Sequence, residues 1–252
     1  YLKNEIIFEP YDSLIRTLIP NTNQAIEFCE AHPSLFHLTY WYEPNEDILG
    51  LIYLSCKNIG NRKSMGSYYT PTKVAEKLIA NLNITSTDKV LDPCCGTGNF
   101  LLQLPPTVPF ENIYGNDIDS TSVKITRLNM ALKYDNLSVD VIMEHITENN
   151  YLTDSQKQNF QYIIGNPPWG YEFSEDEKAK LKGIYKTASN KNIESYDLFI
   201  ERALKNLSTN GQLSYVLPEA VLNVKAHTGI RNIIMQSNSI QYLEFLGNTF
   251  DG

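Results

Sequence analysis

The residues best suited to chemistry lie in one short stretch, Asn166-Pro167-Pro168-Trp169, which closely follows a pair of isoleucines. Proline fixes φ and donates no hydrogen bond, so a strand entering this rigid turn would hold the Asn166 side-chain oxygen close to the Pro167 carbonyl. Two acceptors beside an aromatic ring suit a flat base with an exocyclic amino group, because the acceptors can take both amino hydrogens. The alternative is a Pro-Pro turn with an exposed Trp169, and the stretch alone favours neither.

A second candidate site lies where a glycine-containing turn follows a short apolar strand. Within residues 89–101, Asp92 ends the strand, and Gly96 and Gly98 lie in the turn that opens a helix. Glycine lets the backbone approach a ligand closely, as in the first βα turn of nucleotide-binding sheets. Leu101 stands where the dinucleotide fingerprint has its third glycine, so a phosphate-free nucleoside is favoured over a pyrophosphate ligand.

Two further features point to the same kind of ligand. Asp117 ends the next predicted strand, about 20 residues past the glycines, where a ribose-binding carboxylate is expected. Upstream, Thr70 is predicted to cap a helix with Pro71 at its first position, so free N–H groups would face a ligand carboxylate. An ordinary capped helix without a ligand is the alternative there.

The elements that must position these residues alternate between strand and helix. This pattern predicts an α/β fold with a doubly wound, mostly parallel sheet, preceded by a small helical region. Ligands in such sheets bind at the carboxyl ends of the strands. Residues 1–65 are expected to form a helical extension without chemistry, used for packing or partner contact, and residues 66–252 the domain that holds the site. Strands are expected near 89–92, 112–119, 138–143, 160–165, 211–217 and 240–246.

Composition limits the function classes. No run is long enough for a transmembrane helix, and the start of the chain lacks the features of a signal peptide. The 4 cysteines show no CxxC spacing, which disfavours a zinc site or disulfides and favours a reducing cytoplasm. The net charge of -8 argues against strong nucleic-acid binding by this segment alone, so such a role would need a basic patch or a basic partner.

Taken together, Tyr69-Thr70-Pro71, the stretch 92–98, Asp117 and the Asn-Pro-Pro-Trp turn resemble the S-adenosylmethionine-dependent DNA adenine-N6 methyltransferases. The cofactor motifs come first, which is the gamma arrangement of type I modification subunits and fused restriction-modification enzymes. The resemblance covers about residues 46–252. It implies a Rossmann-like methyltransferase domain that transfers a methyl group from S-adenosylmethionine to the N6 amino group of a flipped adenine in DNA.

The resemblance also implies roles for individual residues. Asp117 would accept the ribose hydroxyls, Ile118 would pack on the cofactor adenine, and Asn150 would replace the family's usual aspartate at the adenine amino group. Most of the other matching positions would contact the methionine end of the cofactor. The full set of cofactor-contacting positions is Tyr69, Thr70, Asp92, Cys94, Gly96, Gly98, Asp117, Ile118, Asn150 and Asn166.

For the target adenine, the resemblance implies that Asn166 and the Pro167 carbonyl act on the amino group and that Trp169 stacks on the ring. Phe250 matches a family aromatic on the opposite side of the base, and its alternative is an ordinary core phenylalanine. The cysteines of the motif, including Cys94, would be packing groups, and no cysteine nucleophile is needed.

The family sheet ends with a further antiparallel strand and is followed by a target-recognition domain. Neither is expected within residues 66–252, so this domain is predicted to be incomplete at its C-terminal end. The expected partners are double-stranded DNA, a specificity subunit or separate target-recognition domain, and a restriction subunit as a further candidate, with no membrane. Two alternatives stay open: a glutamine or rRNA guanine amino methyltransferase, and a non-catalytic subunit of a modification complex.

Overall fold

The computed structural model of the chain describes residues 11–36, 43–56, 69–155, 158–189 and 193–247. Its centre is a five-stranded sheet in which every neighbouring pair of strands is parallel. The strand order is β3-β2-β1-β4-β5, so the chain starts in the middle, moves to one edge, and then returns to build the other half. The strands are β1 (Val90–Asp92), β2 (Ile113–Asp117), β3 (Ile146–Glu148), β4 (Phe160–Gly165) and β5 (Leu207–Tyr215).

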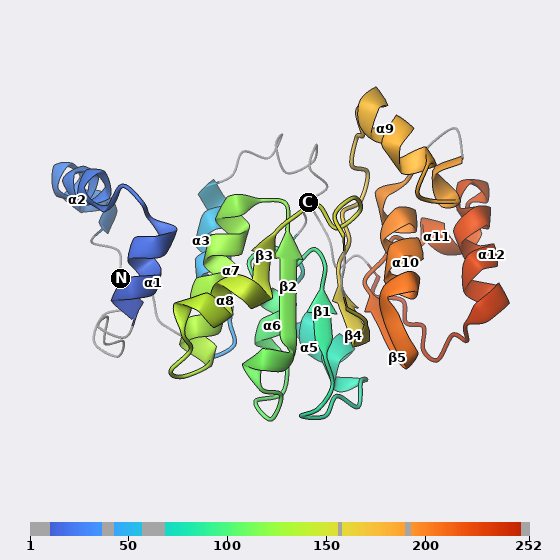
Figure 1. The fold of residues 1–252 in the computed structure, drawn as a ribbon, viewed down its shortest axis with the longest axis horizontal. Coiled ribbons are helices and arrows are strands. Elements are labelled where there is room, and N and C mark those ends of the chain that lie inside the picture. Colours follow the sequence, from blue (N-terminus) through green and yellow to red (C-terminus); the bar gives the residue numbers. More distant parts are fainter. Residues whose placement is uncertain (1–10, 37–42, 57–68, 156–157, 190–192, 248–252) are drawn as a thin grey trace.

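Helices cover both faces of this sheet (Figure 1). Alternate side chains of a strand point to opposite faces, so Val90 of β1 packs into one apolar cluster and Leu91 into another. A parallel sheet buried on both faces confirms the predicted doubly wound α/β class. The helices and 3₁₀ turns are α1 (Asp12–Leu18), α2 (Thr22–Ala31), η2 (Pro33–Phe36), α3 (Ile48–Cys56), α5 (Thr72–Ala80), α6 (Asn99–Leu102), η3 (Phe110–Asn112), α7 (Ser120–Lys133), α8 (Val139–His145), α9 (Glu175–Lys182), η4 (Thr187–Ser189), α10 (Ser195–Asn206), α11 (Ala220–Asn223), η5 (Lys225–His227) and α12 (Thr228–Ser237).

The strand expected at 138–143 is wrong, because this stretch forms helix α8. The Ser138 hydroxyl oxygen accepts a hydrogen bond from the Val141 backbone N–H at 3.3 Å, which caps the helix start. Ile142 and His145, three positions apart, are both buried on one helical face. The strand itself, β3, begins only after the helix has ended.

The sixth strand expected at 240–246 is also absent, since no residue from 238 to 247 belongs to a strand. Within the described chain the sheet therefore has five strands, with β5 at its edge. Ile240, Leu243 and Phe245 of this segment are exposed apolar side chains, which explains how their pattern resembled a strand. No described helix has the length and apolar character needed to cross a membrane.

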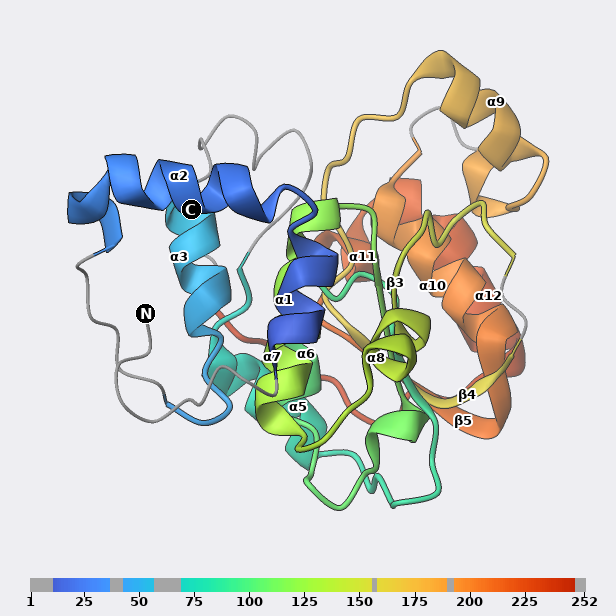
Figure 2. The same cartoon turned by 60° about the vertical axis from the view of Figure 1, so that its left-hand side comes forward.

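The N-terminal helices pack beside the α7–α8 side of the domain (Figure 2). Leu14 and Leu18 of α1 are buried in the same apolar cluster as Ile142 of α8. Helix α2 buries none of its side chains, whereas α3 packs against α7. The division of the chain at residue 65 stays a prediction.

Candidate active site

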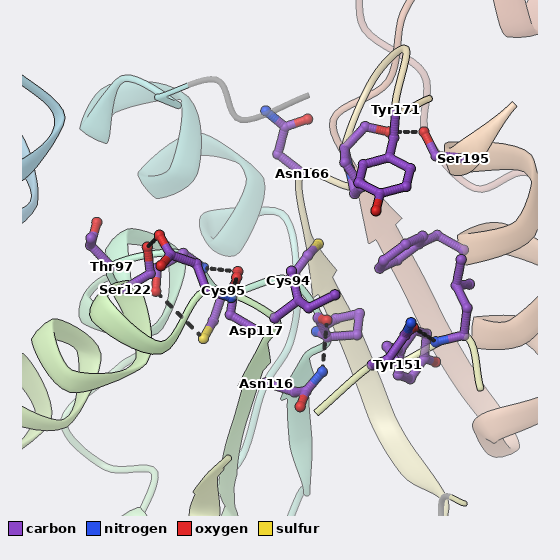
Figure 3. Close-up of a pocket in the computed structure, with 18 of the residues that line it drawn as sticks. Cys94, Cys95, Thr97, Asn116, Asp117, Ser122, Tyr151, Asn166, Tyr171 and Ser195 are labelled. Atoms are coloured by element: carbon purple, nitrogen blue, oxygen red, sulfur yellow. Dashed lines mark hydrogen bonds between the residues drawn. The ribbon is translucent and has the colours of Figure 1, made fainter. Parts of the chain in front are cut away.

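A cavity opens beyond the carboxyl ends of β1, β2 and β4, where the strand order reverses (Figure 3). This is the point at which doubly wound sheets bind ligands. It brings together eight of the twelve described residues that the sequence singled out. The other four, which are not lining residues, are Asp92, Gly98, Pro167 and Trp169. The predicted residues that line it are Tyr69, Thr70, Cys94, Gly96, Asp117, Ile118, Asn150 and Asn166.

The turn after β1 has the backbone conformation that its glycines permit. Gly96 has φ of +54° and Gly98 has φ of +96°, both in the left-handed region that favours glycine. A methyl group placed on Gly96 would meet no atom within 4 Å, so this part of the turn faces open space. Gly98 directly precedes α6. The backbone of the turn is therefore free to approach a ligand.

Asp117 joins this turn to the turn after β2. Its carboxylate accepts hydrogen bonds from the Gly96 N–H at 2.8 Å and from the Asp119 N–H at 2.9 Å. Burial raises the pKa of Asp117 above its ordinary value, although both N–H bonds oppose that shift. Ile118, the next residue, is 54% exposed and presents an apolar surface to the cavity.

Asp92 lies beneath the cavity and is fully buried. One carboxylate oxygen accepts the Cys94 N–H at 3.1 Å, and the other has no hydrogen-bond partner among the described residues. Burial raises the pKa of Asp92 to about 8. Burial also raises the pKa of the Cys94 and Cys95 thiols well above the ordinary value. Both thiols are therefore protonated at neutral pH, which is consistent with packing groups and not with nucleophiles.

Asn166 holds the most informative side chain of the site. Its amide nitrogen donates a hydrogen bond to the Thr70 hydroxyl oxygen at 3.0 Å. Its amide oxygen is buried and has no hydrogen-bond partner among the described residues. The Thr70 carbonyl in turn accepts a bond from Asn99 at 2.6 Å, which ties the pair to α6. The nitrogen of the amide is thus held in place, and Asn166 itself lines the cavity.

This arrangement corrects the predicted role of Thr70 as a helix cap. Helix α5 begins at Thr72, with Pro71 in the cap position and no side-chain capping bond. Thr70 instead directs its hydroxyl to Asn166. Tyr69 lines the cavity, and its hydroxyl shares a hydrogen bond with the Thr72 hydroxyl at 3.3 Å.

The aromatic side chains do not all lie where the sequence pattern suggested. Pro168 lines the cavity and its carbonyl accepts the Ser195 hydroxyl at 2.5 Å. Trp169 is half-buried, packs against two apolar clusters, and is not among the lining residues. Tyr171 lines the cavity instead, with its ring centroid 4.8 Å from that of Phe173. Figure 3 shows Tyr171 on the far side of the cavity from Asp117.

Asn150 and Phe250 are two further residues that the sequence predicted for the site. The Asn150 side-chain oxygen accepts the Leu152 N–H at 3.0 Å, so it is already used in a local turn at the cavity edge. Phe250 lies outside the described residues. The sequence did not single out several residues that also line the cavity. Some of them, such as Asn116, Tyr151 and Tyr171, lie within two positions of a predicted motif residue. The other residues of this kind include Leu54, Ser122, Ser195 and Phe199.

The site and the sheet together define a doubly wound α/β protein with a nucleoside-type ligand site at its switch point. Among the described residues, no cluster of three or more His, Cys, Asp or Glu side chains could hold a metal ion. The sequence profile of the N-6 DNA methylase family matches residues 45–247, and the chain belongs to this family.

Individual relatives agree with this assignment. The chain is 27% identical over 215 residues to the type II methyltransferase M.VspI of Vibrio sp. (strain 343), covering 83% of this chain and 50% of the relative. It is 29% identical over 145 residues to the methylase subunit of the type I restriction enzyme MpnII of Mycoplasma pneumoniae, covering 52% of this chain and 26% of the relative. The chain therefore spans half or less of the length of these relatives.

A solved structure supports the fold. The methyltransferase subunit of a type I restriction-modification system from Streptococcus thermophilus superimposes with a TM-score of 0.50 at 23% identity. The match covers 75% of this chain and 43% of that chain.

Proposed function

We propose that this chain transfers a methyl group from S-adenosylmethionine to the N6 amino group of an adenine in DNA. The observation that supports this most is the Asn166 amide at the wall of the cavity. Its nitrogen is held by Thr70, and its buried oxygen has no hydrogen-bond partner in the part of the chain that the structure describes. An acceptor fixed in this way suits a ligand that offers an amino hydrogen. The family to which the chain belongs supports the same chemistry.

The residues present fit the proposed methyl donor. Gly96 exposes backbone to open space, and Asp117 and Thr70 offer polar groups at the same cavity. Asp117 would accept the ribose hydroxyls, the turn at Gly96 and Gly98 with Thr70 would hold the methionine end, and Ile118 would contact the adenine ring. When bound, S-adenosylmethionine supplies an electrophilic methyl group on a sulfonium centre.

On the target side, Asn166 and the Pro167 carbonyl would accept the two hydrogens of the adenine amino group. That nitrogen is a weak nucleophile, because its lone pair is conjugated with the ring. Acceptors that bind its hydrogens favour a tetrahedral nitrogen and compensate the positive charge that develops in the transition state. The fixed position of the Asn166 amide also lowers the entropic cost of bringing the reacting atoms together.

The adenine must leave the duplex, which costs a few kcal/mol, and stacking on an aromatic side chain offsets about 1–3 kcal/mol of that cost. Trp169 is the stacking residue that the sequence suggests. Because it is packed against two apolar clusters, this role requires the indole to rotate towards the base. Phe250 is proposed for the other side of the base.

The proposed partners are double-stranded DNA and a specificity subunit or target-recognition domain, with a restriction subunit as a further candidate. The net charge of -8 supports a separate source for most of the phosphate contacts. One relative is itself called a methylase subunit, which supports assembly with other subunits. The cytoplasmic location stays a prediction.

The family match disfavours glutamine and rRNA guanine amino groups as substrates, and the hydrogen bond that holds Asn166 on Thr70 at the cavity disfavours a non-catalytic subunit. The test is a single-turnover assay with methyl-labelled S-adenosylmethionine and adenine-containing duplex, followed by mass spectrometry of the nucleosides. We expect N6-methyladenine to form at similar rates with the wild type and with Asn232→Ala, an exposed position on α12, and about 10²–10³-fold more slowly with Asn166→Ala. Label on protein or RNA alone, or equal product from Asn166→Ala, would contradict the proposal.

A further inference from the structure

A buried carboxylate outside the recognised motifs contacts the glycine turn. Asp47, directly before α3, has 0% of its surface exposed. Its carboxylate accepts hydrogen bonds from the Thr97 hydroxyl, from the Asn129 side-chain nitrogen at 2.8 Å and from the Gly50 N–H at 2.9 Å. An ionised carboxylate only accepts hydrogen bonds, so it can hold all three donors at once. The sequence pattern had given this region no chemical role.

Thr97 stands between Gly96 and Gly98, and it is held on two sides. Its side chain donates to Asp47, and its carbonyl accepts a second bond from Asn129 at 2.8 Å. Asn129 belongs to α7, so Asp47, Thr97 and Asn129 form a closed buried network between α7 and the segment before α3. The conformation of the glycine turn therefore depends on Asp47, which lies 50 positions before Thr97 in the sequence.

The same segment also reaches the second ligand turn. The Tyr53 hydroxyl of α3 donates to the Asp119 carboxylate at 2.7 Å, and the Asp119 N–H donates to Asp117 at 2.9 Å. Leu54, next to Tyr53, lines the cavity. Residues 47–54 thus contact both turns that Asp117 joins.

We propose that residues 47–54 are part of the cofactor site and that Asp47 is a positioning residue, which sets the glycine turn through Thr97. This inference rests on the proposed function, since the ligand of the turn is taken to be S-adenosylmethionine. It adds a segment upstream of the Tyr69-Thr70-Pro71 motif to the parts of the chain on which cofactor affinity depends.

Gly50 offers a sharp test, because a methyl group there would overlap both the Asp47 carboxylate and the Thr97 hydroxyl. Gly50 lies inside α3, where alanine is ordinarily the better helix former by about 1 kcal/mol. Helix propensity alone therefore predicts a neutral or stabilising change. The positioning role predicts that Gly50→Ala displaces Asp47 from Thr97 and weakens cofactor binding.

Isothermal titration calorimetry with S-adenosylmethionine separates these expectations. We expect Gly50→Ala and Asp47→Asn each to raise the dissociation constant about tenfold, the effect of losing one hydrogen bond to a charged group. Asn in place of Asp47 keeps the shape but cannot accept from all three donors. At saturating cofactor, the single-turnover rate of both variants should return towards the wild-type value, as expected for residues that act through cofactor binding.

Two controls distinguish positioning from loss of stability. Gly183→Ala, at the end of α9, adds a methyl group that meets only the Lys180 carbonyl oxygen at 3.4 Å, and its affinity should equal that of the wild type. Leu14→Ala removes a buried side chain of α1 and should lower the melting temperature without changing the affinity. If Gly50→Ala and Asp47→Asn both bind S-adenosylmethionine with wild-type affinity, the role of Asp47 is refuted but the proposed function is not. Failure of the wild type to bind S-adenosylmethionine would instead overturn the proposed function.

Discussion

The hydrogen bond between Asn166 and Thr70 gives the most specific prediction. Asn166→Ala removes the buried acceptor that is proposed to bind the adenine amino group. Loss of one such preorganised group costs about 10²–10³ in turnover, or roughly 2.7–4 kcal/mol of transition-state stabilisation. Because the amide oxygen has no other partner among the described residues, this loss should fall on turnover and leave the cofactor dissociation constant close to that of the wild type.

Thr70→Val keeps the branched shape but removes the hydroxyl that accepts the Asn166 amide nitrogen at 3.0 Å. A buried donor left without a partner costs about 1–3 kcal/mol, and the amide is then free to rotate its oxygen away from the base. We expect turnover to fall by about tenfold, which corresponds to about 1.4 kcal/mol. Thr70→Ser, which keeps the hydroxyl, should retain most of the activity.

A double-mutant cycle tests whether Thr70 acts on turnover through Asn166. In the Asn166→Ala background the amide is gone, so Thr70→Val should reduce the single-turnover rate little further. Any effect of Thr70→Val on cofactor affinity should be the same in both backgrounds. Rates measured at saturating cofactor and affinities from calorimetry provide the two readouts. Strictly additive losses of turnover would refute the account of this pair.

Three further predictions concern stability. Burial raises the pKa of Asp92 from 3.8 to about 8, so the unfolded chain binds fewer protons there and stability falls as pH rises between those values. Asp92→Asn should therefore stabilise the cofactor-free protein more at pH 8 than at pH 5 in thermal melts, and an equal change at both pH values would contradict this. Phe160→Ala should lower the unfolding free energy by about 3–5 kcal/mol in urea titrations, since this ring is fully buried; a loss below 1 kcal/mol would contradict its place in the core. Gly98→Ala should cost about 1–2 kcal/mol because φ is +96° there and the new methyl would lie 3.1 Å from Thr126, and an unchanged melting temperature would contradict that strain.

The sequence predicted the strands that hold the ligand residues because each ends in a chemically distinctive turn. Asp92 and Asp117 end their strands and Asn166 directly follows β4, and parallel strands bring their carboxyl ends to one edge of the sheet. The prediction of a strand at 138–143 failed because the apolar residues of this stretch, with Asp140 between Val139 and Val141, fit a strand as well as a short helix. Ser138 decides between them by capping the helix, a local signal that the alternation obscured.

The parts of the site that depend on tertiary contacts could not be predicted. Asp47 reads as an ordinary acidic residue before a helix, and only the fold brings it to Thr97. Trp169 and Tyr171 differ by two positions, and the packing of apolar clusters determines which of them faces the cavity. Threonine is a residue type that commonly caps helices, but the Thr70 hydroxyl accepts a hydrogen bond from Asn166, 96 positions away in the sequence.

A crystal structure with S-adenosylhomocysteine, the demethylated product of the proposed donor, tests the central claim most directly. The account predicts that the ribose hydroxyls contact the Asp117 carboxylate, that the methionine end lies along the turn at Gly96, and that the sulfur faces the Asn166 amide. Ligand bound elsewhere, or with its sulfur turned away from Asn166, would contradict it.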